Sequence, residues 1–167
     1  MRRTFISLAA AAGLVAAAAP LAAQGFSVSE HGSCQMARGG AGVASPCPDG
    51  SAIFFNPAGI VGRRGWTISA GLTTIAAGGS FTADATRAVT DLKNNPIPVP
   101  HIYIVDGISD KVAAGLGLFI PYGLGTKWDS TSVARYVGYD NSLSTIYIQP
   151  TIAVRPDPAI AIGAGLD

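Results

Sequence analysis

Apolar and polar side chains alternate with a period of two along most of the chain after residue 65. In the segment that begins at Trp66, the even positions as far as Leu72 are apolar and the odd positions are small or polar. The same alternation returns in residues 112–120, 145–154 and 159–166, and residues 97–105 form a further candidate that prolines interrupt. Such alternation is typical of β-strands with one apolar face. The sequence therefore predicts about five strands, with the apolar face on the even-numbered positions.

The links between these strands are alternately short and long. Residues 106–110 and 155–158 are short links, whereas the links after the first and third strands run roughly over residues 76–96 and 121–142. Short turns that alternate with long loops, between strands of about 10 residues, are the layout of an outer-membrane β-barrel. Aromatic residues near the strand ends fit its interfacial girdles: Trp66, Tyr122, Trp128, Tyr136 and Tyr139. A soluble β-sandwich also alternates, and this alternative stays open on the alternation alone.

The N-terminus has the layout of a secretory signal peptide. Two arginines follow Met1, residues 5–19 are an unbroken run of apolar and small side chains, and a small-residue zone follows. We expect residues 1–23 to be the signal peptide, with cleavage after Ala23 or Gly25. The sequence contains no later apolar stretch of about 20 residues, so a membrane-spanning form would have to use strands closed into a barrel. Export and the alternation of the links together favour the barrel over the sandwich.

Composition narrows the possible functions further. Charged residues make up 13% of the chain, about half the usual share, and the net charge is +1 at pH 7. This charge provides no basic field for nucleic acid, and 49% hydrophobic residues argue against disorder. The sequence has no Gly-x-Ser-x-Gly, His-Glu-x-x-His or Walker motif, so we expect neither an enzyme nor a bound cofactor or metal.

Four sequence blocks carry a family resemblance. They are a Gly/Ala-rich stretch at 37–44, Asn56-Pro57-Ala58-Gly59-Ile60, the Pro-Tyr-Gly-Leu block at 119–128 and the Ile-Tyr-Ile-Gln-Pro strand at 143–153. In order and spacing, they resemble the outer-membrane long-chain fatty-acid and hydrocarbon transporter family of the FadL/TodX/OmpP1 type. The resemblance implies an all-β, antiparallel transmembrane barrel of about 14 strands in the bacterial outer membrane. It also implies an N-terminal hatch at residues 24–64, with Asn56, Pro57 and Ala58 as its motif.

The resemblance also implies a route for a ligand. A hydrophobic molecule is caught at the extracellular loops, enters the barrel and leaves sideways near a kink in the third strand. That kink falls at residues 120–124, where Pro121 lacks a backbone donor and Gly123 weakens a strand. Residues on the implied path are Phe26, Phe119, Ile120, Tyr122, Gly123 and Tyr147. Packing is the alternative role for Phe119 and Tyr147, and Asn56 has the alternative role of a turn residue before Pro57.

Long-chain fatty acids are the first substrate class that the resemblance implies, and aromatic hydrocarbons are the second. The expected partners are outer-membrane lipid and lipopolysaccharide around a monomeric barrel. An exported structural or adhesive β-protein without a pore is the alternative from another class. Residues 65–167 provide only about five strands, which cannot close a barrel without leaving backbone groups unpaired in lipid. We therefore expect an N-terminal fragment whose remaining strands lie beyond Asp167.

Two cysteines lie in the expected hatch. Because the bacterial envelope is oxidising, a disulfide between Cys34 and Cys47 is the favoured interpretation. Two unpaired thiols are the alternative, and a zinc site that adds His31 is less favoured.

Overall fold

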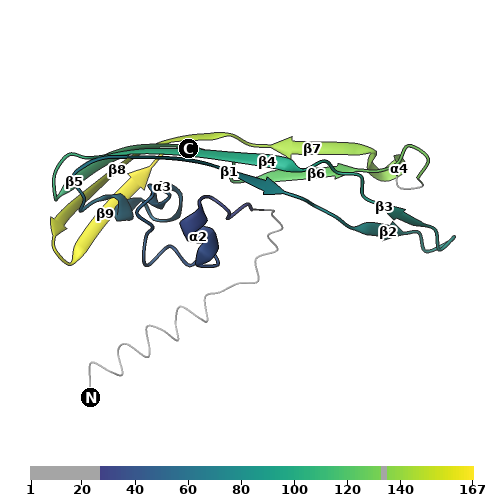
Figure 1. Cartoon of the computed structure of the whole chain (residues 1–167), viewed down its shortest axis with the longest axis horizontal. Coiled ribbons are helices and arrows are strands. Elements are labelled where there is room, and N and C mark those ends of the chain that lie inside the picture. The colour runs from purple at the N-terminus through teal and green to yellow at the C-terminus, as the bar shows by residue number, and fades with distance from the viewer. Residues whose placement is uncertain (1–26, 133–134) are drawn as a thin grey trace, which may run out of the picture.

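The computed structural model describes residues 27–132 and 135–167, and places a long antiparallel sheet beside small N-terminal helices (Figure 1). The expected signal peptide, both expected cleavage positions and Phe26 lie outside the described residues. Among the helices that the structure describes, none has the length and apolar character needed to cross a membrane.

The main sheet contains the five strands that the alternation predicts. In spatial order they are β1 (Gly65–Ile75), β4 (Ile97–Gly107), β5 (Val112–Phe119), β8 (Tyr147–Asp157) and β9 (Ile160–Gly165). Every neighbouring pair is antiparallel. Strands of up to 11 residues suit the apolar thickness of a membrane when they are tilted. The predicted all-β, antiparallel class is confirmed.

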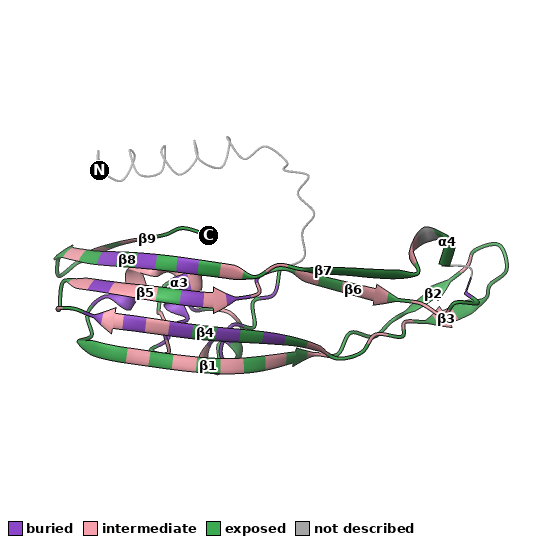
Figure 2. Cartoon of the chain, turned by 90° about the horizontal axis from the view of Figure 1, so that it is seen from above, coloured by how far each residue is buried: buried purple, intermediate pink, exposed green. Residues whose placement is uncertain are grey.

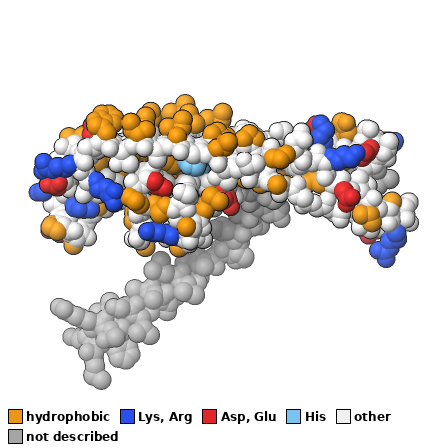
Figure 3. Space-filling model, viewed as in Figure 1, with side chains coloured by type: hydrophobic (Ala, Val, Ile, Leu, Met, Phe, Trp, Pro, Cys, Tyr) orange, Lys and Arg blue, Asp and Glu red, His pale blue; other side chains and the backbone are white. Residues whose placement is uncertain are grey.

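The register keeps even-numbered residues on one face of the sheet. Ile104 lies opposite Ile68 on one side and opposite Leu116 on the other, and the same parity continues into β8 and β9. Burial therefore alternates along the strands (Figure 2). Exposed apolar residues of the even face include Trp66, Ile68, Leu72, Ile102, Leu116, Ile148, Ile152 and Ile162. Hydrophobic side chains cover this surface, on the side of the sheet away from the helices (Figure 3).

The odd face of the sheet packs against the N-terminal segment, residues 27–64. This segment contains α2 (Ser33–Ala37), α3 (Ala52–Phe55) and the 3₁₀ helix η1 (Pro57–Ile60). The shared core consists of Ala52, Ile53, Ile60, Val61, Tyr103, Val105, Ala113, Phe119 and Ala153. Gln149 of β8 donates a hydrogen bond of 3.2 Å to the carbonyl of Ile53, and Arg155 donates one of 3.3 Å to the carbonyl of Val61. Side chains of the sheet thus bind the backbone of the segment directly.

The two long links differ from the loops expected from the sequence. The first contains a hairpin of β2 (Ser80–Thr82) and β3 (Val89–Asp91), and the second contains β6 (Gly123–Lys127), α4 (Arg135–Gly138) and β7 (Asp140–Ser144). Both hairpins extend beyond one end of the main sheet (Figure 1). Strands of three to five residues contain too few alternations to produce a recognisable pattern in the sequence.

Candidate functional site

The chain passes from the main sheet to the β6–β7 hairpin through a break in two strands. Strand β5 ends at Phe119 and β6 begins at Gly123, while β7 ends at Ser144 and β8 begins at Tyr147. In the gap, Thr145 donates to the carbonyl of Tyr122 through its backbone N–H (3.2 Å) and through its hydroxyl (2.9 Å). The N–H of Val28 donates to the carbonyl of Pro121 at 2.8 Å. The N-terminal segment therefore reaches the break itself.

The same break leaves part of β4 without a partner on one side. The β4–β5 ladder runs from the pair Ile102–Leu118 to the pair Asp106–Ala114, whereas among the described strands residues 97–101 of β4 pair only with β1. In the described part of the chain, β6 pairs only with β7. Pro98 and Pro100 lack the N–H groups that a further ladder would need. The sheet is therefore open between the start of β4 and β6.

A cavity of about 360 Å³ occupies this opening, a volume at the lower end of the range for small-molecule sites. Its apolar lining comes from the N-terminal segment, the end of β1, β4, the break and the hairpin: Val28, Ile75, Ile97, Val99, Ile120, Leu124 and Leu143. Leu124 and Leu143 are a cross-strand pair of the hairpin. Polar lining residues include Asn94, Lys127, Asp140 and Asn141. The site thus combines apolar with polar side chains, and we call the half-exposed pair Lys127 and Asp140 its rim.

Opposite charges are paired at and near this rim. The ammonium of Lys127 lies 2.9 Å from a carboxylate oxygen of Asp140, and the nearby Lys93 pairs with Asp129. Asp140 raises the pKa of Lys127, and the hydrogen bond from Lys93 keeps the pKa of Asp129 below its ordinary value. Each of the two lysines therefore has an acidic partner within hydrogen-bonding distance.

Aromatic side chains pack beside the break, at the interface of the N-terminal segment with the sheet. Phe119 is fully buried, and its ring centroid lies 5.2 Å from that of Phe54, 5.5 Å from that of His31 and 6.1 Å from that of Tyr147. Tyr147 in turn lies 6.1 Å from Tyr122. None of these five rings lines the cavity.

The residues of the implied ligand path therefore lie in two places. Ile120 and Gly123 line the cavity, whereas Phe119, Tyr122 and Tyr147 belong to the aromatic cluster beside the break. The sequence did not identify Val28, Val99, Leu124 or Leu143 as lining residues. Each of them is apolar, but nothing in the sequence indicates that the four side chains meet.

The motif of the expected hatch forms a turn on the inner face of the sheet. The side-chain amide of Asn56 donates to the carbonyl of Val43 at 2.8 Å, and Pro57 and Ala58 begin η1. The backbone of Pro57 and Ala58 lies directly against Gly163 of β9. The motif thus contacts the Gly-rich stretch through Asn56 and the main sheet through Pro57 and Ala58.

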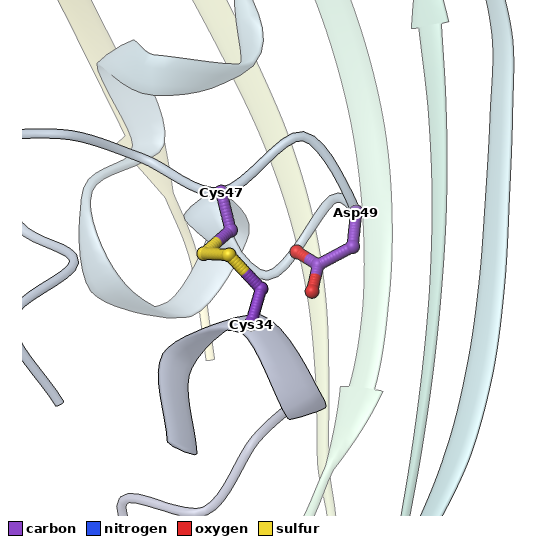
Figure 4. A group of neighbouring side chains, drawn as sticks. All are labelled: Cys34, Cys47 and Asp49. Carbon is purple, nitrogen blue, oxygen red and sulfur yellow. A yellow bond between two sulfur atoms is a disulfide. The ribbon is translucent and has the colours of Figure 1, made fainter. Parts of the chain in front are cut away.

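The two cysteines are joined by a disulfide, with their Cα atoms 6.1 Å apart (Figure 4). Asp49 lies beside them, with a carboxylate oxygen within 4.8 Å of both sulfurs. Because each sulfur is bonded to the other, neither is a thiolate that could hold a zinc ion. The disulfide closes the Gly-rich stretch into a loop.

The strand architecture and the exposed apolar face define a β-rich outer-membrane protein. Residues 13–167 match the family described as "Outer membrane protein transport protein (OMPP1/FadL/TodX)". The chain belongs to this family, which confirms the resemblance seen in the sequence and the location in the outer membrane.

Relatives with curated descriptions agree with this assignment. The chain is 27% identical over 185 aligned positions to outer membrane protein P1 of Haemophilus influenzae, an alignment covering 100% of this chain and 40% of the relative. It is 27% identical over 146 positions to the long-chain fatty acid transport protein of Salmonella typhi (86% and 34%). It is 30% identical over 103 positions to the putative outer membrane protein NMB0088 of Neisseria meningitidis (56% and 22%). The chain thus spans 40% or less of the length of these relatives.

Proposed function

We propose that the complete protein takes up hydrophobic molecules across the outer membrane, with long-chain fatty acids as the first candidate substrate and aromatic hydrocarbons as the second. The observation that carries the proposal is the apolar cavity in the opening between β4 and β6. The family assignment supports it, as does the name of the Salmonella typhi relative. Binding needs no chemistry, because burial of apolar surface contributes about 25 cal/mol per Å².

In this proposal, the molecule moves sideways rather than along the axis of the barrel. The N-terminal segment acts as the hatch: Gln149 and Arg155 bind its backbone, and Gly163 lies against its 3₁₀ helix. The two hairpins in the long links lie beyond the membrane and catch the ligand. The cavity then receives it and releases it through the part of the wall where β4 lacks a partner.

The barrel itself is part of the proposal. Strands β1 and β9 are the edges of the main sheet, and within residues 27–132 and 135–167 no strand pairs with the outer side of either. Such edges are costly in lipid, because no water is available to bind them. We propose that residues 65–167 form the first strands of a barrel that further strands of the complete protein close around the hatch at residues 24–64.

Growth on single carbon sources tests the function. A strain that lacks the gene should grow poorly on oleate or on a toluene-type hydrocarbon, and the complete gene should restore growth. Normal growth of the deletion strain on every hydrophobic substrate would remove the uptake proposal.

A variant of the cavity tests the site. Leu124→Glu places a charge in the apolar lining and should abolish uptake, whereas the volume-conserving variant Leu124→Met should retain it. Equal uptake by both variants, at equal amounts of protein in the outer membrane, would show that the ligand does not use this cavity.

A further inference from the structure

The rim of the cavity carries one charge of each sign. Among the described lining residues, Lys127 and Asp140 are the only ones with ionisable side chains, and the other polar residues are neutral amides and hydroxyls. Lys127 is the group that a ligand carboxylate would contact. Its availability for such a contact depends on how firmly Asp140 holds it.

The fold places these two residues directly opposite each other. Lys127 and Asp140 are a cross-strand pair at the end of the β6–β7 ladder, and their charged atoms are 2.9 Å apart. The backbone of Lys127 is fixed as well: its N–H donates to the side-chain oxygen of Asn94 at 2.8 Å, and its carbonyl accepts from the N–H of Lys93 at 2.8 Å. Both members of the pair are therefore positioned before a ligand arrives.

A ligand carboxylate would have to compete with Asp140 for Lys127. Asp140 is tethered in register, whereas the ligand loses translational freedom when it binds. The nearby cation Lys93 has its own partner in Asp129, so it does not add an unpaired charge. The mouth of the cavity therefore presents apolar surface with no net charge.

We propose that Asp140 is a specificity-determining residue that neutralises Lys127, so that the cavity selects its ligand by the apolar tail and not by a carboxylate. This inference rests on the proposed uptake function and specifies the ligand class for the same site. It assigns to the pair a role in selection in addition to closing the hairpin. A fatty acid and its uncharged ester or alcohol should then bind almost equally well.

A charge cycle on the complete protein in detergent tests the proposal with oleate and methyl oleate, two probes with the same tail. The measured quantity is the ratio of the affinity for the acid to the affinity for the ester. Asp140→Asn frees the cation and should raise this ratio roughly fivefold, whereas Lys127→Gln leaves the carboxylate and should lower it by a similar factor. The double variant has no charge at the rim, so its ratio should match that of the wild type.

Two controls distinguish an electrostatic effect on ligand selection from a general effect on protein stability: the salt dependence of the ratio and a variant of a distant ion pair. The shift in Asp140→Asn should fade in about 1 M salt, because ions screen exposed charges over about 3 Å there. Asp110→Asn frees Arg64 in the same way at the opposite end of the sheet, and should leave the ratio unchanged. A ratio that does not move in either single variant would overturn the inference while uptake stands, as would a wild-type ratio tenfold above that of the double variant. Failure of both probes to bind any form would remove the proposed function itself.

Discussion

His31 lies fully buried where the N-terminal segment meets the sheet, and its ring packs edge-on against those of Phe54 and Phe119. Burial is the main reason that its pKa falls from the ordinary value of 6.5 to about 4, and the neighbouring His101 lowers it further while Glu30 acts in the opposite direction. A released His31 therefore binds a proton at a higher pH than the docked one. Docking of the segment should be strongest above pH 6.5 and should weaken as the pH falls from 6.5 to 4.

Hydrogen exchange of residues 33–60 in the complete protein measures this effect. Between pH 7 and pH 4, the free energy of local opening should fall by roughly 3 kcal/mol, after correction for the intrinsic exchange rate. His31→Phe keeps an aromatic ring in the same place and removes the titrating group, so its opening energy should change much less with pH. The same decline in both proteins would assign the effect to another group.

The disulfide between Cys34 and Cys47 limits the conformational freedom of the unfolded Gly-rich stretch that lies between the two cysteines. Gly39 and Gly40 within it have φ values of +60° and +81°, in the region that favours glycine. The two cysteines are 13 residues apart in the sequence, and closing a loop of this size contributes about 3 kcal/mol in the chain-entropy model. Replacing both cysteines by alanine should thus lower the free energy of unfolding of the N-terminal segment by about 3 kcal/mol. Hydrogen exchange of residues 33–60 with and without a reductant checks it: the reductant should weaken protection in the wild type and leave the double variant unaffected.

At the level of elements, the contact between η1 and β9 depends on a missing side chain. Gly163 lies so close to the backbone of Pro57 and Ala58 that a β-carbon there would overlap it. Gly163→Val should therefore push η1 off the sheet, at a cost of about 1–3 kcal/mol. Gly79 has open space around it, so Gly79→Val is the matched control. Limited proteolysis should cut residues 51–62 faster in the first variant alone, and equal cleavage of both variants would contradict this role of Gly163.

The main sheet and the β6–β7 hairpin differ in how well a sequence pattern predicts them. The five strands of the main sheet were predictable, because the alternation of apolar with small or polar residues continues along each of them. The β6–β7 hairpin was not, since Leu124 and Leu143 lie 19 positions apart and five-residue strands form only when the partner is present. Pairing between short segments is a property of the fold and leaves little trace in either segment alone.

The candidate site was predictable only where a residue acts locally. Pro121 and Gly123 mark the break in the strand by their own backbone chemistry, and the break is where the cavity lies. The rest of the lining depends on β4 extending beyond β5, which brings Val28 and Val99 together with the hairpin. No local pattern encodes how far one strand extends past its neighbour.

For the molecule as a whole, the strand register predicts that the even face of the main sheet contacts lipid. Leu116 and Ile148 project from the middle of the sheet on the even face, and 44% and 60% of their surfaces are exposed. In water, a continuous apolar surface of this kind would be a liability, but in a membrane it is what the acyl chains contact. Spin labels at either position in the complete protein, reconstituted in lipid, should therefore be relaxed by oxygen rather than by a water-soluble nickel complex.

Ile108 is the matched control for these labels, because it is equally apolar and exposed but lies in the turn between β4 and β5. A label there should report the aqueous or headgroup region. If labels at Leu116 and Ile148 instead report water, the even face is not in contact with lipid. The odd face is already covered by the N-terminal segment, so such a result would leave no apolar surface for the membrane and would contradict the barrel itself.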